Sequence, residues 1–88
     1  SVPPVDENAP PAAFVRAAIT ALAAGHPGEA QEAIERAEAR LLVRDVDPRR
    51  IQEPSENPLI AQLREARALI PTDRSQALAI LQNLQARL

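Results

Sequence analysis

The chain has 88 residues and a formal net charge of −2, and it contains no cysteine. A chain this short forms one domain with a small core, and without cysteine it has no disulfide, thiolate zinc site or cysteine nucleophile. All of its basic residues are arginine and its only aromatic residue is Phe14, so neither the charge nor the base-stacking side chains of a nucleic-acid-binding protein are present.

Residues 1–10 are predicted to form an extended, proline-rich leader, because proline fixes φ and keeps its predecessor out of the helical region. The sequence begins SVPPVDENAPP without an initiator methionine, a pattern typical of the residues after a signal-peptide cleavage site. We therefore expect a periplasmic or secreted protein. A trimmed chain from a cytoplasmic protein would begin in the same way. No apolar run reaches the roughly 18 residues that a membrane span requires.

The first predicted hairpin covers residues 11–43, with helices over residues 11–24 and 27–43. The first of them is rich in alanine, the best helix former. In the turn GHPG, Gly25 suits the left-handed position after a helix and Pro27 suits the first position of the next one. Apolar residues at helical spacing predict one buried stripe per helix: Phe14, Ala18, Ala21 and Leu22, then Ala30, Ile34, Ala37 and Leu41.

Residues 44–57 are predicted to be a linker, because charged residues and prolines alternate there. The second hairpin covers residues 58–88, with helices over residues 58–70 and 74–87. Asn57 is placed to cap the first of these helices, and Thr72 or Asp73 is placed to cap the second, where Asp73 with Gln76 resembles a capping box. Their predicted stripes are Leu59, Leu63, Ala66 and Ile70, then Ala77, Leu81, Leu84 and Leu88. No segment alternates with a period of two, so no sheet is expected.

The second helix of each hairpin repeats the same stripe at a shift of 47 residues, pairing Ala30 with Ala77 and Ile34 with Leu81. The segment ALAAGHPGEAQEAIERA, residues 21–37, together with Ala18, resembles a tetratricopeptide repeat in its small-small-large-small spacing and its turn glycine. The second hairpin departs from that pattern at Glu65 and Thr72. The resemblance implies closely packed helical hairpins and a partner-binding role. The Ala/Arg-rich composition also resembles that of small exported bacterial proteins.

A metal site built from carboxylates is the main alternative to a role in binding a protein partner. His26 and Glu29 form a His-x-x-Glu pair, and Glu32 lies three residues further along. However, glutamates three residues apart step by about 300° around a helix, so Glu29, Glu32, Glu35 and Glu38 are expected to fan across a solvated face. Glu32 also precedes Arg36 by four residues, which favours an ion pair. Both interpretations stay open, and no cofactor is expected.

Two further groups are candidate contacts for a protein partner. The linker contains three arginines whose guanidinium groups can form two parallel hydrogen bonds with a carboxylate of a partner: Arg44, Arg49 and Arg50. Several apolar residues outside the main stripes, or at the chain end, could form a second apolar surface: Val15, Ile60, Leu78, Ile80 and Leu88. A homodimer would bury such a surface.

The sequence therefore predicts an all-α domain of two antiparallel helical hairpins, packed as a four-helix, tetratricopeptide-like bundle. Its single histidine lies in a turn and no serine has an identifiable base, so we expect a non-enzymatic protein. The predicted function is binding to another protein or to itself, with metal-ion binding as the alternative.

Overall fold

The computed structural model describes residues 5–44 and 57–88, and the statements that follow concern those residues. They contain four helices and no strand: α1 (Pro11–Ala23), α2 (Pro27–Arg44), α3 (Pro58–Leu69) and α4 (Arg74–Arg87). The predicted all-α class and the four helices are confirmed, with helix ends that differ from the prediction by at most one residue. None of these helices combines the length and the hydropathy that a membrane span requires.

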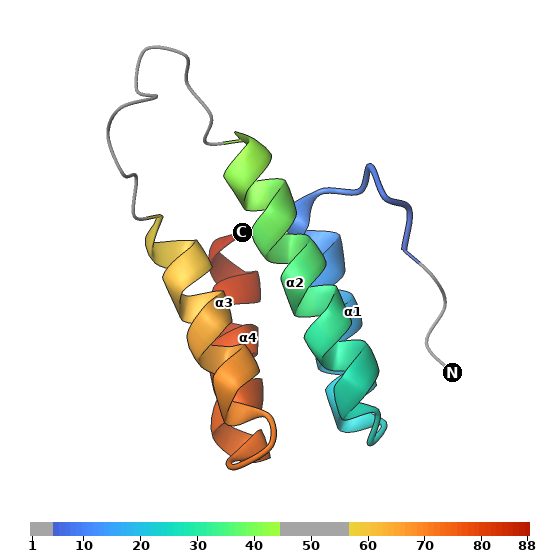
Figure 1. Cartoon of the computed structure of the whole chain (residues 1–88), viewed down its shortest axis with the longest axis vertical. Coiled ribbons are helices and arrows are strands. Elements are labelled where there is room, and N and C mark those ends of the chain that lie inside the picture. Colours follow the sequence, from blue (N-terminus) through green and yellow to red (C-terminus); the bar gives the residue numbers. More distant parts are fainter. Residues whose placement is uncertain (1–4, 45–56) are drawn as a thin grey trace.

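The helices form two antiparallel hairpins that lie side by side and make a four-helix bundle, with α2 and α3 at the front of Figure 1 and α1 and α4 behind them. Besides the contacts within each hairpin, α2 packs against α3 and α1 packs against α4. The diagonal pairs of described helices are not in contact. The four helices therefore close into a ring around a shared core.

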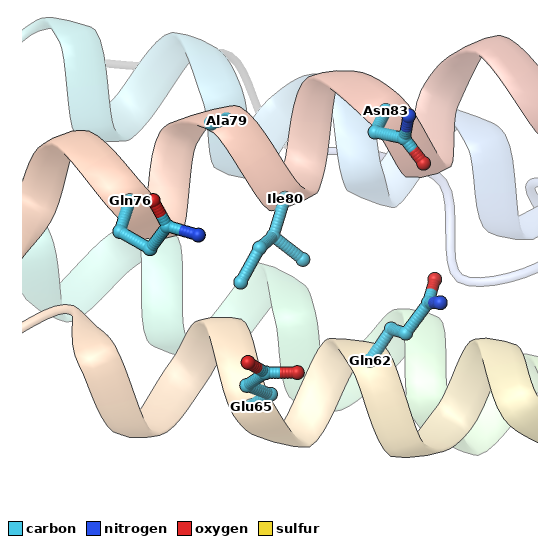
Figure 2. A pocket seen from close by; sticks show the side chains of 6 residues that line it. All are labelled: Gln62, Glu65, Gln76, Ala79, Ile80 and Asn83. Carbon is cyan, nitrogen blue, oxygen red and sulfur yellow. The ribbon is translucent and has the colours of Figure 1, made fainter.

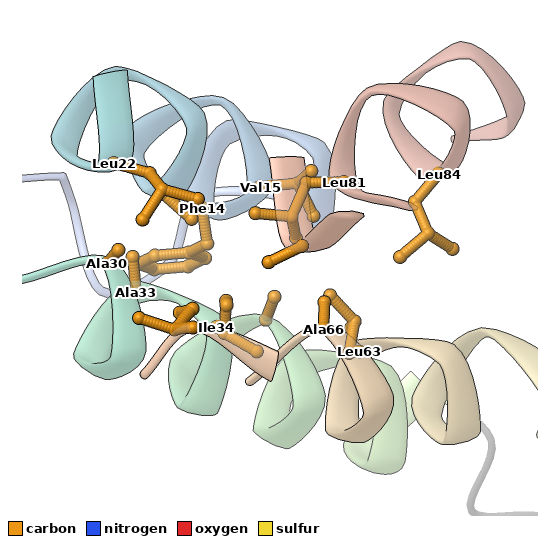
Figure 3. Close-up of a cluster of buried hydrophobic side chains, with 14 of the residues drawn as sticks. Phe14, Val15, Leu22, Ala30, Ala33, Ile34, Leu63, Ala66, Leu81 and Leu84 are labelled. Atoms are coloured by element: carbon orange, nitrogen blue, oxygen red, sulfur yellow. The ribbon is translucent and has the colours of Figure 1, made fainter. Parts of the chain in front are cut away.

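The core is entirely apolar among the described residues, and all four helices contribute to it (Figure 3). Its buried hydrophobic members are Phe14, Val15, Ala18, Ala21, Leu22, Ala30, Ala33, Ile34, Ala37, Leu41, Ile60, Leu63, Ala66, Ile70, Ala77, Leu81 and Leu84. The stripes predicted for the first hairpin are confirmed in full. In the second hairpin Leu59 is only half-buried and Leu88 is 36% exposed, because these residues lie in the first turn of α3 and just beyond α4.

The turn between α1 and α2 is a Schellman motif. The His26 N–H donates to the Ala21 carbonyl at 2.8 Å, and the Gly25 N–H donates to the Leu22 carbonyl at 3.2 Å. Gly25 has a φ of 81°, the left-handed conformation predicted from its position. The His26 carbonyl then accepts the first bond of α2, from the Ala30 N–H at 3.1 Å. His26 therefore occupies the N-cap position through its backbone, while its side chain is exposed.

The second hairpin turns without a glycine. The N–H groups of Thr72 and Asp73 both donate to the Leu69 carbonyl, at 3.0 and 2.6 Å, and no described non-glycine residue has a positive φ. The predicted caps are present: the Asn57 side chain accepts from the Leu59 N–H at 2.8 Å, and Asp73 accepts from the Gln76 N–H at 3.1 Å. This turn explains how Thr72 can stand where the first hairpin has a glycine.

Burial also shows how the two hairpins correspond. Ala66, not Glu65, is the fully buried small residue of α3. The buried positions Val15, Ala18 and Leu22 therefore match Leu63, Ala66 and Ile70 at a shift of 48, whereas those of α2 and α4 match at 47. The second hairpin is one residue shorter across its turn, which places Glu65 on the surface.

Candidate functional site

The candidate metal ligands at the start of α2 are not brought together. His26, Glu29 and Glu32 are all exposed, and Glu32 accepts from the Arg36 guanidinium at 2.9 Å, as the i,i+4 spacing predicts. Within the described ranges no group of three or more His, Asp or Glu side chains is placed to hold a metal ion. Metal binding by these residues stays a prediction without a structural site to support it.

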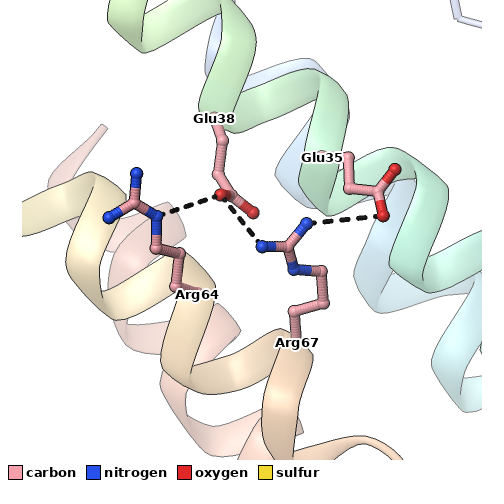
Figure 4. Close-up of polar contacts among 4 residues, drawn as sticks. All are labelled: Glu35, Glu38, Arg64 and Arg67. Atoms are coloured by element: carbon pink, nitrogen blue, oxygen red, sulfur yellow. Dashed lines mark ion pairs between the residues drawn. The ribbon is translucent and has the colours of Figure 1, made fainter.

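The last glutamate of α2 does not belong to a solvated face: the Glu38 side chain is 13% exposed, so the expectation is wrong for this residue, whereas Glu35 is 58% exposed as expected. Figure 4 shows Glu35 and Glu38 facing Arg64 and Arg67 of α3. Glu38 Oε1 lies 3.7 Å from Arg64 Nε and 3.5 Å from Arg67 Nη2, and Glu35 Oε1 lies 3.4 Å from Arg67 Nη1. The α2/α3 contact brings these charges together, which spacing along one helix could not reveal.

Glu38 is the most buried member of this cluster, with a side chain that is 13% exposed and an Oε2 atom that is buried without a hydrogen-bond partner. Loss of solvation raises the pKa of Glu38 above its ordinary value of 4.5, and the nearby Arg67 and Arg64 offset only part of this effect. The desolvation of the Glu38 charge therefore opposes the attraction between the charges of the cluster.

The candidate partner contacts divide into three groups. Arg49, Arg50 and the side chain of Arg44 lie outside the described part of the chain. Val15 and Ile60 are 0% and 7% exposed, so the expectation that they form a surface is wrong. They belong to the shared core, since the closing of the ring covers the sides of α1 and α3 on which they lie.

The remaining candidates are accessible. Leu78 and Ile80 are half-buried side chains of α4 that pack against the edge of the core, and Leu88 is partly exposed at the end of α4. Two further large apolar residues that the sequence analysis did not single out, Leu42 and Val43, are exposed in the last turn of α2.

Ile80 lies in a groove between α3 and α4, which we call the α3/α4 groove (Figure 2). Its volume is about 220 Å³, and it is lined by Gln62, Glu65, Gln76, Ala79, Ile80 and Asn83. Figure 2 shows the Ile80 side chain projecting from α4 between the three amide side chains and Glu65. Gln62 also accepts a hydrogen bond from Arg87, which ties the two helices together at one end of the groove. The groove thus offers an apolar centre surrounded by three amide side chains and the carboxylate of Glu65.

Charge is distributed unevenly over the bundle. All of the helical carboxylates lie on α2 and α3, whereas α1 and α4 carry three arginines and no acidic residue. The exposed positions of α4 between its terminal arginines are Ser75, Gln76, Ala79, Gln82, Asn83 and Ala86. The sequence signal for the uncharged exposed side of α4 is the run SQALAILQNLQA, residues 75–86, which contains no charged residue. The run alone does not show which of these residues face solvent; the packing of α4 in the bundle decides that.

The chain matches no protein-family model, and no curated protein and no solved structure is significantly similar to it. Its function is therefore argued from the geometry and chemistry of its own surface.

Proposed function

We propose that this protein is a non-catalytic protein-binding module that docks its partner on α4, with the α3/α4 groove at the centre of the contact. The observation that carries this proposal is the exposed side of α4, which has no charged residue between Arg74 and Arg87 although it faces solvent. A solvent-exposed helix ordinarily carries interspersed charges of both signs, as α2 does here. Depletion of carboxylates is the compositional mark of a contact surface.

The groove supplies the elements that such a contact needs. Ile80 gives an apolar anchor point at the centre, and the amides of Gln62, Gln76 and Asn83 can donate to and accept from a partner backbone. Central apolar contacts surrounded by polar groups are the usual arrangement of interface hot spots. Leu78, on the same helix, is a second half-buried apolar side chain outside the groove.

Charge complementarity favours a different protein over a second copy of the chain. The α1/α4 side carries Arg16, Arg74 and Arg87 without a helical carboxylate. A symmetric homodimer places the same patch on both subunits, so it would bring two surfaces together that each carry several arginines and only one carboxylate, Glu65. A partner with an apolar centre and carboxylates near its rim fits this surface better, since arginine forms its strongest pairs with carboxylates.

The test uses two matched substitutions of exposed alanines. Ala79→Glu places a carboxylate in the α3/α4 groove, and Ala61→Glu places one on α3 outside it. A photo-crosslinking residue at position 79 first captures the partner covalently, and the affinity of the purified partner is then measured for the wild type and both variants. We expect Ala79→Glu to weaken binding by at least about tenfold, the equivalent of one lost interface contact, and Ala61→Glu to have little effect.

The proposal fails if position 79 captures no protein, or if both variants bind equally well. Size-exclusion chromatography with light scattering over a range of concentrations distinguishes the self-association version. A dimer that Ala79→Glu dissociates would replace the heterologous partner with a second copy of the chain.

A further inference from the structure

The two hairpins carry a groove at equivalent places. At the shifts of 48 for α1 and α3 and of 47 for α2 and α4, Gln62 corresponds to Phe14 and Asn83 corresponds to Arg36. Gln62 and Asn83 line the α3/α4 groove, and Phe14 and Arg36 line a pocket between α1 and α2, which we call the α1/α2 groove. Each groove therefore lies on the same side of its hairpin.

The segment before α1 lies against the α1/α2 groove. Residues 5–10 are not helical, and the Ala9 N–H donates to the Asp6 carbonyl at 2.9 Å, which closes a compact turn. Val5 and Ala9 are half-buried against the core, and Glu7 lies at the groove itself. Figure 1 shows this segment, in blue, on the side of the first hairpin that faces away from α3 and α4.

Burial differs between the two grooves. Phe14 and Ala33 of the first hairpin are 2% and 9% exposed, whereas their counterparts Gln62 and Ile80 are half-buried. Every described residue that lines the α3/α4 groove belongs to α3 or α4. Within the described ranges, the second hairpin thus has no segment over its groove that is equivalent to residues 5–10.

We propose that the partner places a short, non-helical segment on the α3/α4 groove, in the position that residues 5–10 occupy on the first hairpin. An aliphatic side chain of this segment contacts Ile80 and Ala79, as Val5 and Ala9 contact the core of the first hairpin. Its backbone groups, which no helix satisfies, exchange hydrogen bonds with the three amide side chains of the groove.

The charges around the two grooves narrow the choice of segment. In the α1/α2 groove Glu7 lies with Arg36, whereas in the α3/α4 groove Asn83 replaces that arginine and Glu65 adds a carboxylate. The arginine that remains, Arg87, already donates to an amide at the end of the groove. A carboxylate in the place of Glu7 would therefore meet a like charge. The segment in the groove is uncharged, and the partner's carboxylates lie outside the groove.

This inference rests on the proposed protein-binding function and specifies what the groove accepts. It predicts that a short turn-forming peptide binds the groove without the rest of the partner. The inference can therefore fail while the proposed function stands, because a partner could dock on α4 through a helix instead.

The experiment titrates the full chain with hexapeptides whose ends are blocked and follows ¹⁵N–¹H spectra. One peptide has the sequence of residues 5–10, VDENAP, and a neutral form carries Asp6→Asn and Glu7→Gln. The asparagine keeps the side-chain acceptor to which the Asn8 N–H donates at 2.8 Å, so the turn is retained. A third peptide adds Val5→Ser to the neutral form and so removes its aliphatic side chain.

We expect the neutral peptide to give saturable shifts of the Gln62 and Asn83 side-chain signals and of the Ile80 backbone signal. Phe14 is expected to show no comparable shift, because its groove is already covered. The acidic peptide is expected to bind at least about threefold more weakly, the effect of one unfavourable pair of exposed charges. The Val5→Ser peptide is expected to bind at least about fivefold more weakly, because it loses the apolar contact.

Two protein variants with matched controls locate the contact. Ala79→Glu is expected to weaken binding of the neutral peptide by at least about fivefold, and Ala61→Glu, on α3 outside the groove, is its control. Glu65→Gln is expected to bring the affinities of the acidic and neutral peptides closer together, and Glu29→Gln on α2 is its control. Circular dichroism melting checks that each variant is folded.

The inference is overturned if the neutral peptide gives no saturable shift at the groove, or if the Val5→Ser peptide binds as tightly. Equal or tighter binding of the acidic peptide, or a Glu65→Gln variant that leaves the difference unchanged, overturns the requirement for an uncharged segment.

Capture of the partner at position 79 separates this inference from the proposed function. Mass spectrometry of the captured partner identifies the crosslinked segment, and a crosslink within a helix of the partner overturns the inference but leaves the function intact. The absence of any captured protein contradicts the function itself.

Discussion

The position of Glu38 on its helix predicts an exposed side chain, whereas the packing of the bundle shields this side chain from solvent. On α2 alone it follows Glu35 by one turn and resembles another exposed carboxylate. In the bundle its side chain is 13% exposed and lies against Arg64 and Arg67 of the neighbouring hairpin. Desolvation raises its pKa more than the two arginines lower it, so the ionised carboxylate is held at a net disadvantage. Its contribution to stability therefore depends on pH.

The Glu38→Gln variant is expected to gain stability relative to the wild type as pH rises from about 4 to about 7. A raised pKa in the folded state means that the stability from this group is fully present below pH 4.5, the ordinary value, and is lost as pH rises through the folded-state pKa. Glutamine does not ionise and loses nothing over this range. Urea denaturation of both proteins at each pH measures the difference in the free energy of unfolding.

Glu32→Gln is the matched control for this prediction, because Glu32 is also paired with an arginine but has a side chain that is 63% exposed. The change with pH is expected to be smaller for this variant. An equal change in the two variants would show that burial of Glu38 in the α2/α3 contact has no effect on the unfolding equilibrium.

At the scale of the elements, local signals in the sequence decide where the helices begin and end. Gly25 closes α1 in a left-handed conformation, and Asn57 and Asp73 accept from the free N–H groups at the starts of α3 and α4. Each of these interactions involves residues only a few positions apart, so each could be predicted without knowledge of the tertiary structure. The turn after α3 satisfies its backbone groups without glycine, which shows that the Schellman turn is one solution among several.

The two glycines of the chain are predicted to respond in opposite ways to alanine. Gly25→Ala is expected to destabilise the protein by about 1–2 kcal/mol, because an L-residue is strained at a positive φ. Gly28→Ala is expected to be neutral or to stabilise by up to about 1 kcal/mol, since alanine is the better helix former. A methyl group at either position meets no atom within 4 Å, so crowding does not separate the two variants. Thermal or urea unfolding measures both, and equal effects would contradict the role assigned to φ.

At the scale of the whole molecule, the closing of the four helices into a ring decides which apolar side chains are buried. The contacts of α1 with α4 and of α2 with α3 put Val15 and Ile60 inside one core. In an open stack of hairpins the last helix would not return to the first, and apolar end faces would remain. The ring instead leaves its accessible apolar residues at the edge of α4 and at the ends of α2 and α4.

Neither hairpin is expected to fold alone, because the core is shared between them. The separate fragments 1–44 and 57–88 are predicted to show little helical circular dichroism, since each loses the part of the core that the other supplies and helices are stabilised mainly by the packing of their apolar face. An equimolar mixture should regain helicity and a cooperative melting transition. A cooperative transition in either isolated fragment would contradict the prediction, and the full chain under the same conditions provides the reference.

Much of the bundle could be predicted from apolar spacing, because a repeat every three to four residues reports which side of a helix is buried. The stripe from Ala30 to Leu41 and that from Ala77 to Leu84 were found in this way. The accessible apolar residues were predicted only in part: Ile80 and Leu78 are half-buried at the edge of the core, but Val15 and Ile60 had the same apolar character and are buried. Spacing along one helix does not tell which neighbouring helix covers its flanks.

The sequence by itself determined the helices, their ends and the residues at the centre of the core, because these depend on interactions within a few positions of the chain. Only the tertiary structure decided which carboxylate is shielded from solvent, which flanking apolar residues remain accessible, and which arginines of the described ranges meet a carboxylate. These outcomes depend on how two hairpins meet, and that contact joins residues far apart in the chain. Glu38 acquires its environment from this contact, whereas Ile80 acquires its environment from the packing of α4 on α3 within the second hairpin.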